Sequence, residues 1–123
     1  MVAINFHPQF AEDVEYGKKR QTIRRKVRCK IGDRLQLYTG QRTKKCRLLD
    51  EVTCNSIAPV KICDTEMFLN GKRLIAGNAL RDEYEDRDND FAQKDGFDSF
   101  VDMADWFRER YGTLPFEGYV IRW

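Results

Sequence analysis

The sequence predicts one α+β domain over residues 1–123, in which short strands form a small β-barrel flanked by helices. Several short runs alternate between apolar and polar side chains, and dipeptides typical of turns separate them. Two other segments repeat apolar residues at helical spacing. A chain of 123 residues is long enough for one domain with a modest core, and a second domain would be cramped.

The first elements are expected to be a strand, a helix and another strand. Residues 2–6 alternate as a short strand, and Pro8 suits the first turn of a helix that Gly17 would end. The apolar face of this helix holds Phe10, Ala11 and Val14. Gly32-Asp33 predicts a turn into a half-buried strand at residues 34–38.

The second half is expected to add a strand at residues 45–54, a hairpin, a helix and a closing strand. Asn70-Gly71 predicts a hairpin between residues 67–69 and 74–75, because both residues tolerate positive φ. Asp98 or Ser99 can cap a helix that ends before Gly112. Its face would hold Phe100, Val101, Ala104, Phe107 and Tyr111. Aromatic and β-branched residues favour a closing strand at 116–123.

Charge is distributed unevenly along the chain, although the formal net charge is only +2. Residues 1–49 carry 13 Lys/Arg and 4 Asp/Glu, whereas residues 50–123 carry 9 and 16. Residues 17–30, here called the basic segment, hold eight of these cations and no acid. Crowded cations repel one another, so an ordered segment of this kind indicates an anion nearby, either a phosphate-bearing ligand or an acidic face of the protein. We therefore expect a nucleotide or RNA partner, with phosphate contacts from Arg20, Arg24, Arg25, Lys26 and Arg28.

Residues 82–105 hold ten acids against Arg87 and Lys94. Such a run is usually a solvated surface. The alternative is an acidic loop that folds over the basic segment and supplies it with a carboxylate.

The sequence does not predict a zinc site, a redox motif or a membrane-spanning segment. Cys29, Cys46, Cys54 and Cys63 contain no CxxC pair, and the single histidine, His7, lies far from them in sequence. No apolar stretch approaches the roughly 18 residues of a transmembrane helix, and the start of the chain lacks a signal-peptide pattern. We expect a cytoplasmic protein with no cofactor and no membrane partner.

The order of several motifs along the chain is characteristic. A short helix precedes Gly17-Lys18-Lys19-Arg20-Gln21-Thr22-Ile23-Arg24, Gly32-Asp33 precedes a strand, and Ala92-Gln93-Lys94-Asp95-Gly96-Phe97 precedes a helix. In this order the chain resembles the ASCH domain, which is similar to the PUA domain and has a small β-barrel with flanking helices. The resemblance spans nearly the whole chain. Its most specific parts are Gly-x-Lys-x-x-Thr-Ile-Arg and Asp-Gly-Phe.

One branch of the ASCH family contains small bacterial amidohydrolases that deacetylate N-acetylcytidine. Their proposed catalytic set is a Lys, a Thr three residues later and a downstream Glu, and the resemblance maps this set onto Lys19, Thr22 and Asp95. Asp95 departs from the pattern by one methylene. Other ASCH proteins resemble RNA-binding modules, and ribonuclease activity is also proposed within the family, so a non-catalytic RNA-binding module and an RNA-cleaving enzyme are the alternatives.

The residues themselves suit amide hydrolysis. A threonine hydroxyl needs a base, and a neutral lysine can serve when burial and neighbouring cations, here Lys18, Arg20 and Arg24, lower its pKa. Asp95 would then orient groups or pass a proton to the leaving amine. The alternatives are purely structural roles: Thr22 fits a strand, Lys19 is solvated at a helix end and Asp95 occupies a turn.

Four aromatic residues have two possible roles. Tyr38, Trp106, Tyr119 and Trp123 are candidates to stack on a base or to fill the core.

Overall fold

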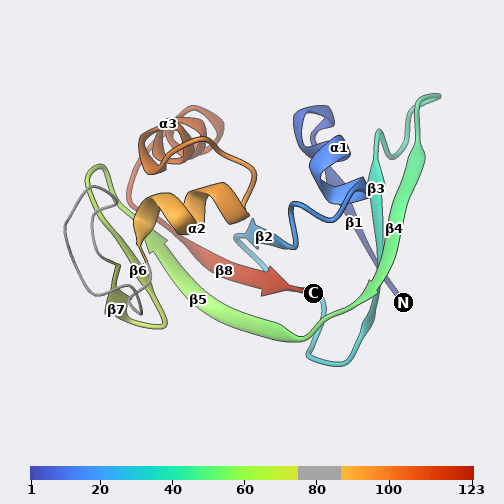
Figure 1. Cartoon of the computed structure of the whole chain (residues 1–123), viewed down its shortest axis with the longest axis horizontal. Coiled ribbons are helices and arrows are strands. Elements are labelled where there is room, and N and C mark those ends of the chain that lie inside the picture. The colour runs from blue at the N-terminus through green and yellow to red at the C-terminus, as the bar shows by residue number, and fades with distance from the viewer. Residues whose placement is uncertain (75–86) are drawn as a thin grey trace.

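The strands form two sheets, shown in Figure 1. The computed structural model describes residues 1–74 and 87–123. One sheet has the order β1-β3-β4, with β1 at Val2–Phe6, β3 at Arg34–Thr39 and β4 at Arg47–Thr53. The other has the order β2-β8-β5-β6-β7, with β2 at Gln21–Arg24, β8 at Phe116–Arg122, β5 at Ser56–Ile62, β6 at Met67–Leu69 and β7 at Lys72–Arg73. The described helices are α1 at Pro8–Glu15, α2 at Asp88–Lys94 and α3 at Phe100–Tyr111.

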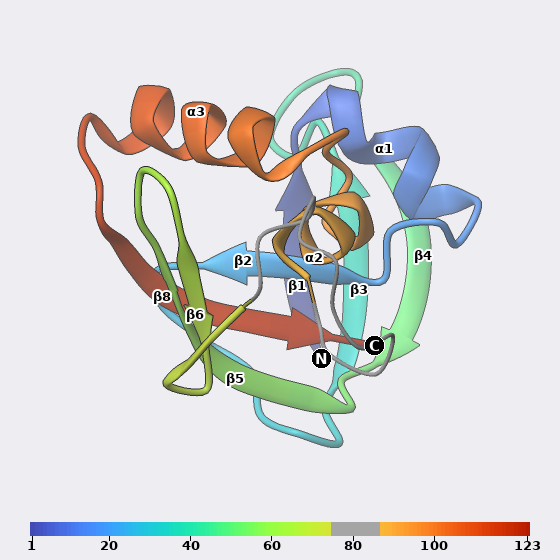
Figure 2. The ribbon, with the colours of Figure 1, turned by 60° about the vertical axis from the view of Figure 1, so that its left-hand side comes forward.

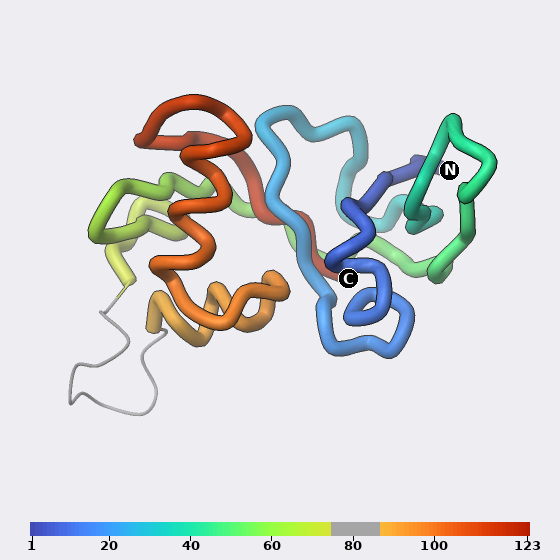
Figure 3. Tube along the Cα trace, turned by 90° about the horizontal axis from the view of Figure 1, so that it is seen from above, coloured from blue at the N-terminus to red at the C-terminus, as the bar shows by residue number. Residues whose placement is uncertain are grey.

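The predicted α+β class is confirmed, but the described strands do not close into the expected barrel. At one corner the chain passes directly from β4 to β5, and Asn55 N donates to Arg122 O at 2.9 Å across the bend. At the opposite corner β1 and β2 share no ladder. Instead, Arg24 Nη2 on β2 donates to Asn5 O on β1 at 2.7 Å. A side chain therefore spans the gap that a strand ladder would close, and Figure 3 shows the basic segment crossing the middle of the molecule there.

The N-terminal predictions are confirmed. β1 covers the predicted residues, α1 buries its predicted apolar face, and Gly17 follows the helix with φ +79°. His7 caps α1, because its Nδ1 accepts from Gln9 N at 3.2 Å. β3 and β4 lie where strands were predicted, each within two residues at its ends.

The predicted hairpin and C-terminal helix are also confirmed, with two corrections. Asn70 and Gly71 have φ of 57° and 79°, but the returning strand begins at Lys72 rather than at residue 74, and residue 75 lies outside the described residues. Ser99 caps α3, and Gly112 ends it in the left-handed conformation. Val101 was expected on the buried face of this helix and is instead 63% exposed, because the packing face holds Met103.

Three elements were not predicted: β2, for which only a strand role of Thr22 was considered, β5 and α2. β5 contains Pro59, and α2 lies within the acidic run, where a loop or a solvated surface was expected. In the described part of that run Asp88 and Asp95 are buried, whereas Asp90, Asp98, Asp102 and Asp105 are exposed. Most of these acids thus form a solvated surface, and Asp95 reaches the basic segment. Residues 82–86 of the run lie outside the described residues.

The helices cover the two sheets from one side. α1 packs on β3 and β4, and α3 packs on β8 and α2. Figure 2 shows α1 and α3 on the same side of the molecule, with α2 in front of β2. Within the described residues, no helix has the length and apolar character needed to cross a membrane.

Candidate active site

A pocket of about 700 Å³, here called the central pocket, lies where β1, α1, β2 and α3 meet. The turn after α2 and the loop at residues 40–45 complete its lining. Its aromatic lining residues include Phe10, Phe97, Trp106 and Tyr111. Small-molecule sites usually measure about 300–1,000 Å³, so the central pocket has room for a nucleoside.

Lys19 and Asp95 meet at the buried base of the central pocket. They are only 2% and 3% exposed, and Lys19 Nζ lies 3.3 Å from Asp95 Oδ1. The same amine donates to the backbone carbonyl of Asp95. Lys19 is therefore not the solvated residue at a helix end that one reading of the sequence suggested.

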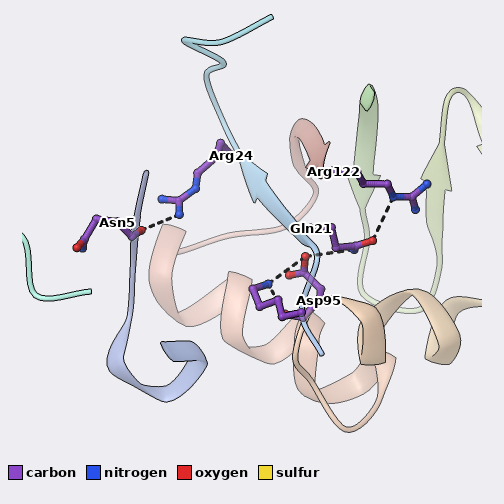
Figure 4. Close-up of polar contacts among 6 residues, drawn as sticks. Asn5, Gln21, Arg24, Asp95 and Arg122 are labelled. Carbon is purple, nitrogen blue, oxygen red and sulfur yellow. Dashed lines mark hydrogen bonds and ion pairs between the residues drawn. The ribbon is translucent and has the colours of Figure 1, made fainter. Parts of the chain in front are cut away.

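Gln21 and Arg122 hold the carboxylate in place, as Figure 4 shows. Gln21 Nε2 donates to Asp95 Oδ1 at 3.2 Å, and Arg122 Nε donates to Gln21 Oε1 at 3.2 Å. Asp95 also ends α2, directly before Gly96 with φ +96°. The expected turn role and a role in the site thus coincide in this residue.

Burial changes the protonation of both partners. It is the largest influence on Lys19 and lowers the pKa of its amine, while the charge of Asp95 and its hydrogen bond act in the opposite direction. Burial likewise raises the pKa of Asp95, against the opposing effects of Lys19 and Gln21. Of the cations that the sequence placed beside Lys19, Arg24 also lowers the lysine pKa, but by less than burial does. The amine therefore loses its proton more readily than an exposed lysine.

Thr22 lines the central pocket from β2 and is 5% exposed. Its backbone pairs with Ile121 of β8, so the residue does fit a strand. Among the described residues its hydroxyl has no hydrogen-bond partner. The strand role and a role toward a ligand are therefore compatible.

Arg24 is the only one of the predicted phosphate-binding residues that lines the central pocket. Its Cζ lies 5.3 Å from the centroid of the Phe6 ring. Its Nε is buried and lacks a hydrogen-bond partner within residues 1–74 and 87–123. A buried donor without a partner is unfavourable, and this one belongs to a side chain that lines the central pocket.

The other predicted phosphate-binding residues lie elsewhere. Arg20 Nε donates to Trp123 O at 3.2 Å, and Arg25 Cζ lies 4.6 Å from the Tyr111 ring centroid. Lys26 and Arg28 line a smaller hollow of about 180 Å³ beside β1. The described part of the basic segment therefore does not present these side chains as one continuous stripe, and its cations form no ion pair with the described acids other than that of Lys19.

Of the four aromatic candidates, one lines the central pocket and one is in the core. Trp106 lines the central pocket, Trp123 packs edge-to-face against Phe6, and neither Tyr38 nor Tyr119 reaches the pocket. Arg110 lines the pocket as well, and its position four residues after Trp106 on one helix is the sequence signal that could have found it. Gln21, Lys44 and Lys45 were also missed, and no local signal indicates where they point.

No described group of three or more His, Cys, Asp or Glu side chains is arranged to hold a metal ion. The four cysteines are free thiols. Burial and the neighbouring Cys54 raise the pKa of Cys29 to about 11, so its thiolate is disfavoured.

Comparisons of the chain with protein-family models, with curated proteins and with solved structures gave no match. The central pocket is therefore the basis for assigning a function.

Proposed function

We propose that the central pocket belongs to an ASCH-type amidohydrolase that removes the acyl group from the exocyclic amine of a modified pyrimidine, as in N-acetylcytidine. One observation carries the proposal: Lys19, Thr22 and Asp95 line the same pocket, and burial lowers the pKa of the lysine. A threonine hydroxyl is a weak nucleophile until a base removes its proton. A lysine amine that is readily deprotonated is such a base.

The reaction would proceed in two steps. In the first, Thr22 Oγ1 attacks the acyl carbon while its proton passes to Lys19 Nζ. The C–N bond then breaks, Lys19 returns the proton to the departing amine, and the acyl group remains as an ester on Thr22. In the second step, water gives a proton to Lys19 and attacks the ester carbon. The bond to Thr22 Oγ1 then breaks, Lys19 returns the proton to that oxygen, and the acid is released.

Asp95 would position the lysine amine. The shorter side chain that distinguishes it from the glutamate of the amidohydrolase branch still brings Oδ1 within 3.3 Å of Lys19 Nζ. Gly96 permits this approach, because a Cβ at residue 96 would lie 2.9 Å from the Phe10 ring and 3.4 Å from Lys19 Cδ.

The test is to incubate the purified protein with N-acetylcytidine and to follow the release of cytidine and acetate by chromatography. Thr22→Ala and Lys19→Met should each remove most of the turnover, and the double variant should be little worse than either, because members of one catalytic unit are not additive. Asp95→Glu should keep or raise the activity.

Thr39→Ala is the matched control. Thr39 is also a buried strand threonine, its hydroxyl donates to Phe6 O at 2.9 Å, and it does not line the central pocket. It should lose stability and retain turnover. If neither the wild type nor Asp95→Glu releases cytidine, the amidohydrolase proposal is rejected.

A non-catalytic RNA-binding module is the second candidate, because Arg25, Lys26 and Arg28 are exposed cations without ion pairs among the described residues. RNA binding that weakens steeply with salt, in a protein that releases no cytidine, would support it. Cleavage of an RNA chain in the same assay would instead support a ribonuclease.

A further inference from the structure

We infer that the central pocket takes its pyrimidine as a nucleotide, with a phosphate bound by Lys44, Lys45 and Arg110, and not as the neutral nucleoside. This inference rests on the proposed function and names the chemical class of its substrate.

The charges that line the central pocket do not balance. Among its described lining residues are the cations Lys19, Arg24, Lys44, Lys45 and Arg110, and the only acid is Asp95. That acid pairs with Lys19. The remaining cations have no counter-charge among the described residues of the pocket, and a neutral nucleoside would supply none. A phosphate group supplies negative charge and several acceptor oxygens.

The two lysines belong to a loop that is fastened in place. Gln41 N donates to Asn5 Oδ1 at 3.0 Å, which ties the loop to β1. The Thr43 hydroxyl donates to Gly40 O at 2.6 Å and accepts from Lys45 N at 3.1 Å. Gly40 has φ +66°, and a Cβ there would lie 2.8 Å from Lys45 O, so the turn depends on glycine. The loop thus holds the backbone of both lysines at the pocket, so binding a ligand costs no backbone conformational entropy there.

Arg110 approaches the pocket from α3. Its Cζ lies 5.5 Å from the Trp106 ring centroid, and none of the described acids pairs with it. Arg108, two residues earlier, pairs with both Asp64 and Asp105. The arginine outside the pocket lining is therefore neutralised, whereas Arg110, which lines the pocket, has no acidic partner among the described residues.

Arg24 adds an independent indication of an anion. Its charge and that of Arg110 are close enough to disfavour each other, and its buried Nε lacks a partner among the described residues. Two neighbouring cations are stabilised when an anion binds between them, because each then gains an opposite charge.

The experiment compares kcat/KM for N-acetylcytidine, its 5′-monophosphate and a short RNA that contains one N-acetylcytidine. We expect the monophosphate to be preferred over the nucleoside by about tenfold or more, because hydrogen bonds to charged groups are the strong ones. The double variant Lys44→Gln/Lys45→Gln should bring this ratio close to one. The control Lys61→Gln/Lys72→Gln removes the same charge from exposed positions on β5 and β7, outside the central pocket, and should keep the wild-type ratio.

Each outcome is decisive. A preference for the RNA over the monophosphate would identify the phosphate as that of an RNA chain and supports the phosphate site. Equal kcat/KM for nucleoside and monophosphate, or equal ratios in the two double variants, would overturn the inference and leave the amidohydrolase proposal standing. If no substrate is turned over, the amidohydrolase proposal fails, and calorimetric binding of cytidine and its 5′-monophosphate then tests the phosphate site. Tighter binding of the monophosphate that the Lys44→Gln/Lys45→Gln variant loses would support the phosphate site. Equal binding of the two compounds would overturn it.

Discussion

Replacing Lys19 with methionine should destabilise the protein by about 3–5 kcal/mol, the usual cost of removing one partner from a buried ion pair. Methionine keeps the unbranched side chain that packs near the Phe10 ring, whose centroid lies 4.9 Å from Lys19 Nζ. Asp95 would then be left buried, with Gln21 as its remaining side-chain partner. The cost arises from the desolvated carboxylate and not from a cavity.

The combination of Lys19→Met with Asp95→Asn tests the coupling of the two residues more directly than either single variant. Asp95→Asn alone should cost about 1–3 kcal/mol, because Lys19 keeps its hydrogen bond to the backbone carbonyl of residue 95. Lys19→Met/Asp95→Asn removes both buried charges, so it should cost only about 1–2 kcal/mol, since neutral replacements of a buried pair are often tolerated. We therefore expect the double variant to be less destabilised than the sum of the single variants by at least about 2 kcal/mol.

Urea unfolding at pH 7, followed by tryptophan fluorescence and by far-ultraviolet circular dichroism, measures all four proteins. Arg47→Gln is the control, because it removes an exposed ion pair with Glu15 and should change stability by only about 0–1 kcal/mol. Single-variant costs that add within about 0.5 kcal/mol would refute the coupling of Lys19 and Asp95.

Two further predictions concern pH and the turn after α2. The stability of the wild type relative to Lys19→Met/Asp95→Asn should fall as the pH rises above about 3.8, because the raised pKa of Asp95 lets the folded state keep a proton that the unfolded chain releases. The relative stability should rise again as the pH approaches 10.5. In that range folded Lys19, whose pKa is lowered, has already released its proton, and the unfolded chain still holds it. Unfolding curves across this range test the point, and a difference independent of pH contradicts it. Gly96→Ala should destabilise by more than about 1 kcal/mol, because φ is +96° and the new Cβ would lie 2.9 Å from the Phe10 ring. Gly112→Ala shares the positive φ but meets open space, so thermal unfolding should show a larger loss for Gly96→Ala than for Gly112→Ala.

The sequence by itself determined the elements that depend on near neighbours. The helix after His7, the hairpin at Asn70-Gly71 and the helix between Ser99 and Gly112 follow from caps and turns. These signals act over a few residues, so they can be recognised without knowledge of the fold.

Tertiary structure overrode the local signals in β5 and α2. Pro59 argues against a central strand, but the ladder between β5 and β6 begins at Val60, and Pro59 needs only its carbonyl, which accepts from Asn70 N at 2.9 Å. α2 is a short helix in an acidic run and is stabilised by burying Phe91 and Ala92. The open corner between β1 and β2 could not be predicted either, because strand patterns do not specify which strands pair.

The candidate site shows the same division. Sequence motifs singled out Lys19, Thr22 and Asp95, but only the fold brings residue 95 to residue 19 and buries both, which is what changes their pKa values. The lysines of the loop at residues 40–45 and Arg110 look like ordinary surface cations in the sequence. They line one pocket because β1, β2 and α3 converge there, and convergence of distant segments depends on long-range packing, which local residue patterns do not encode.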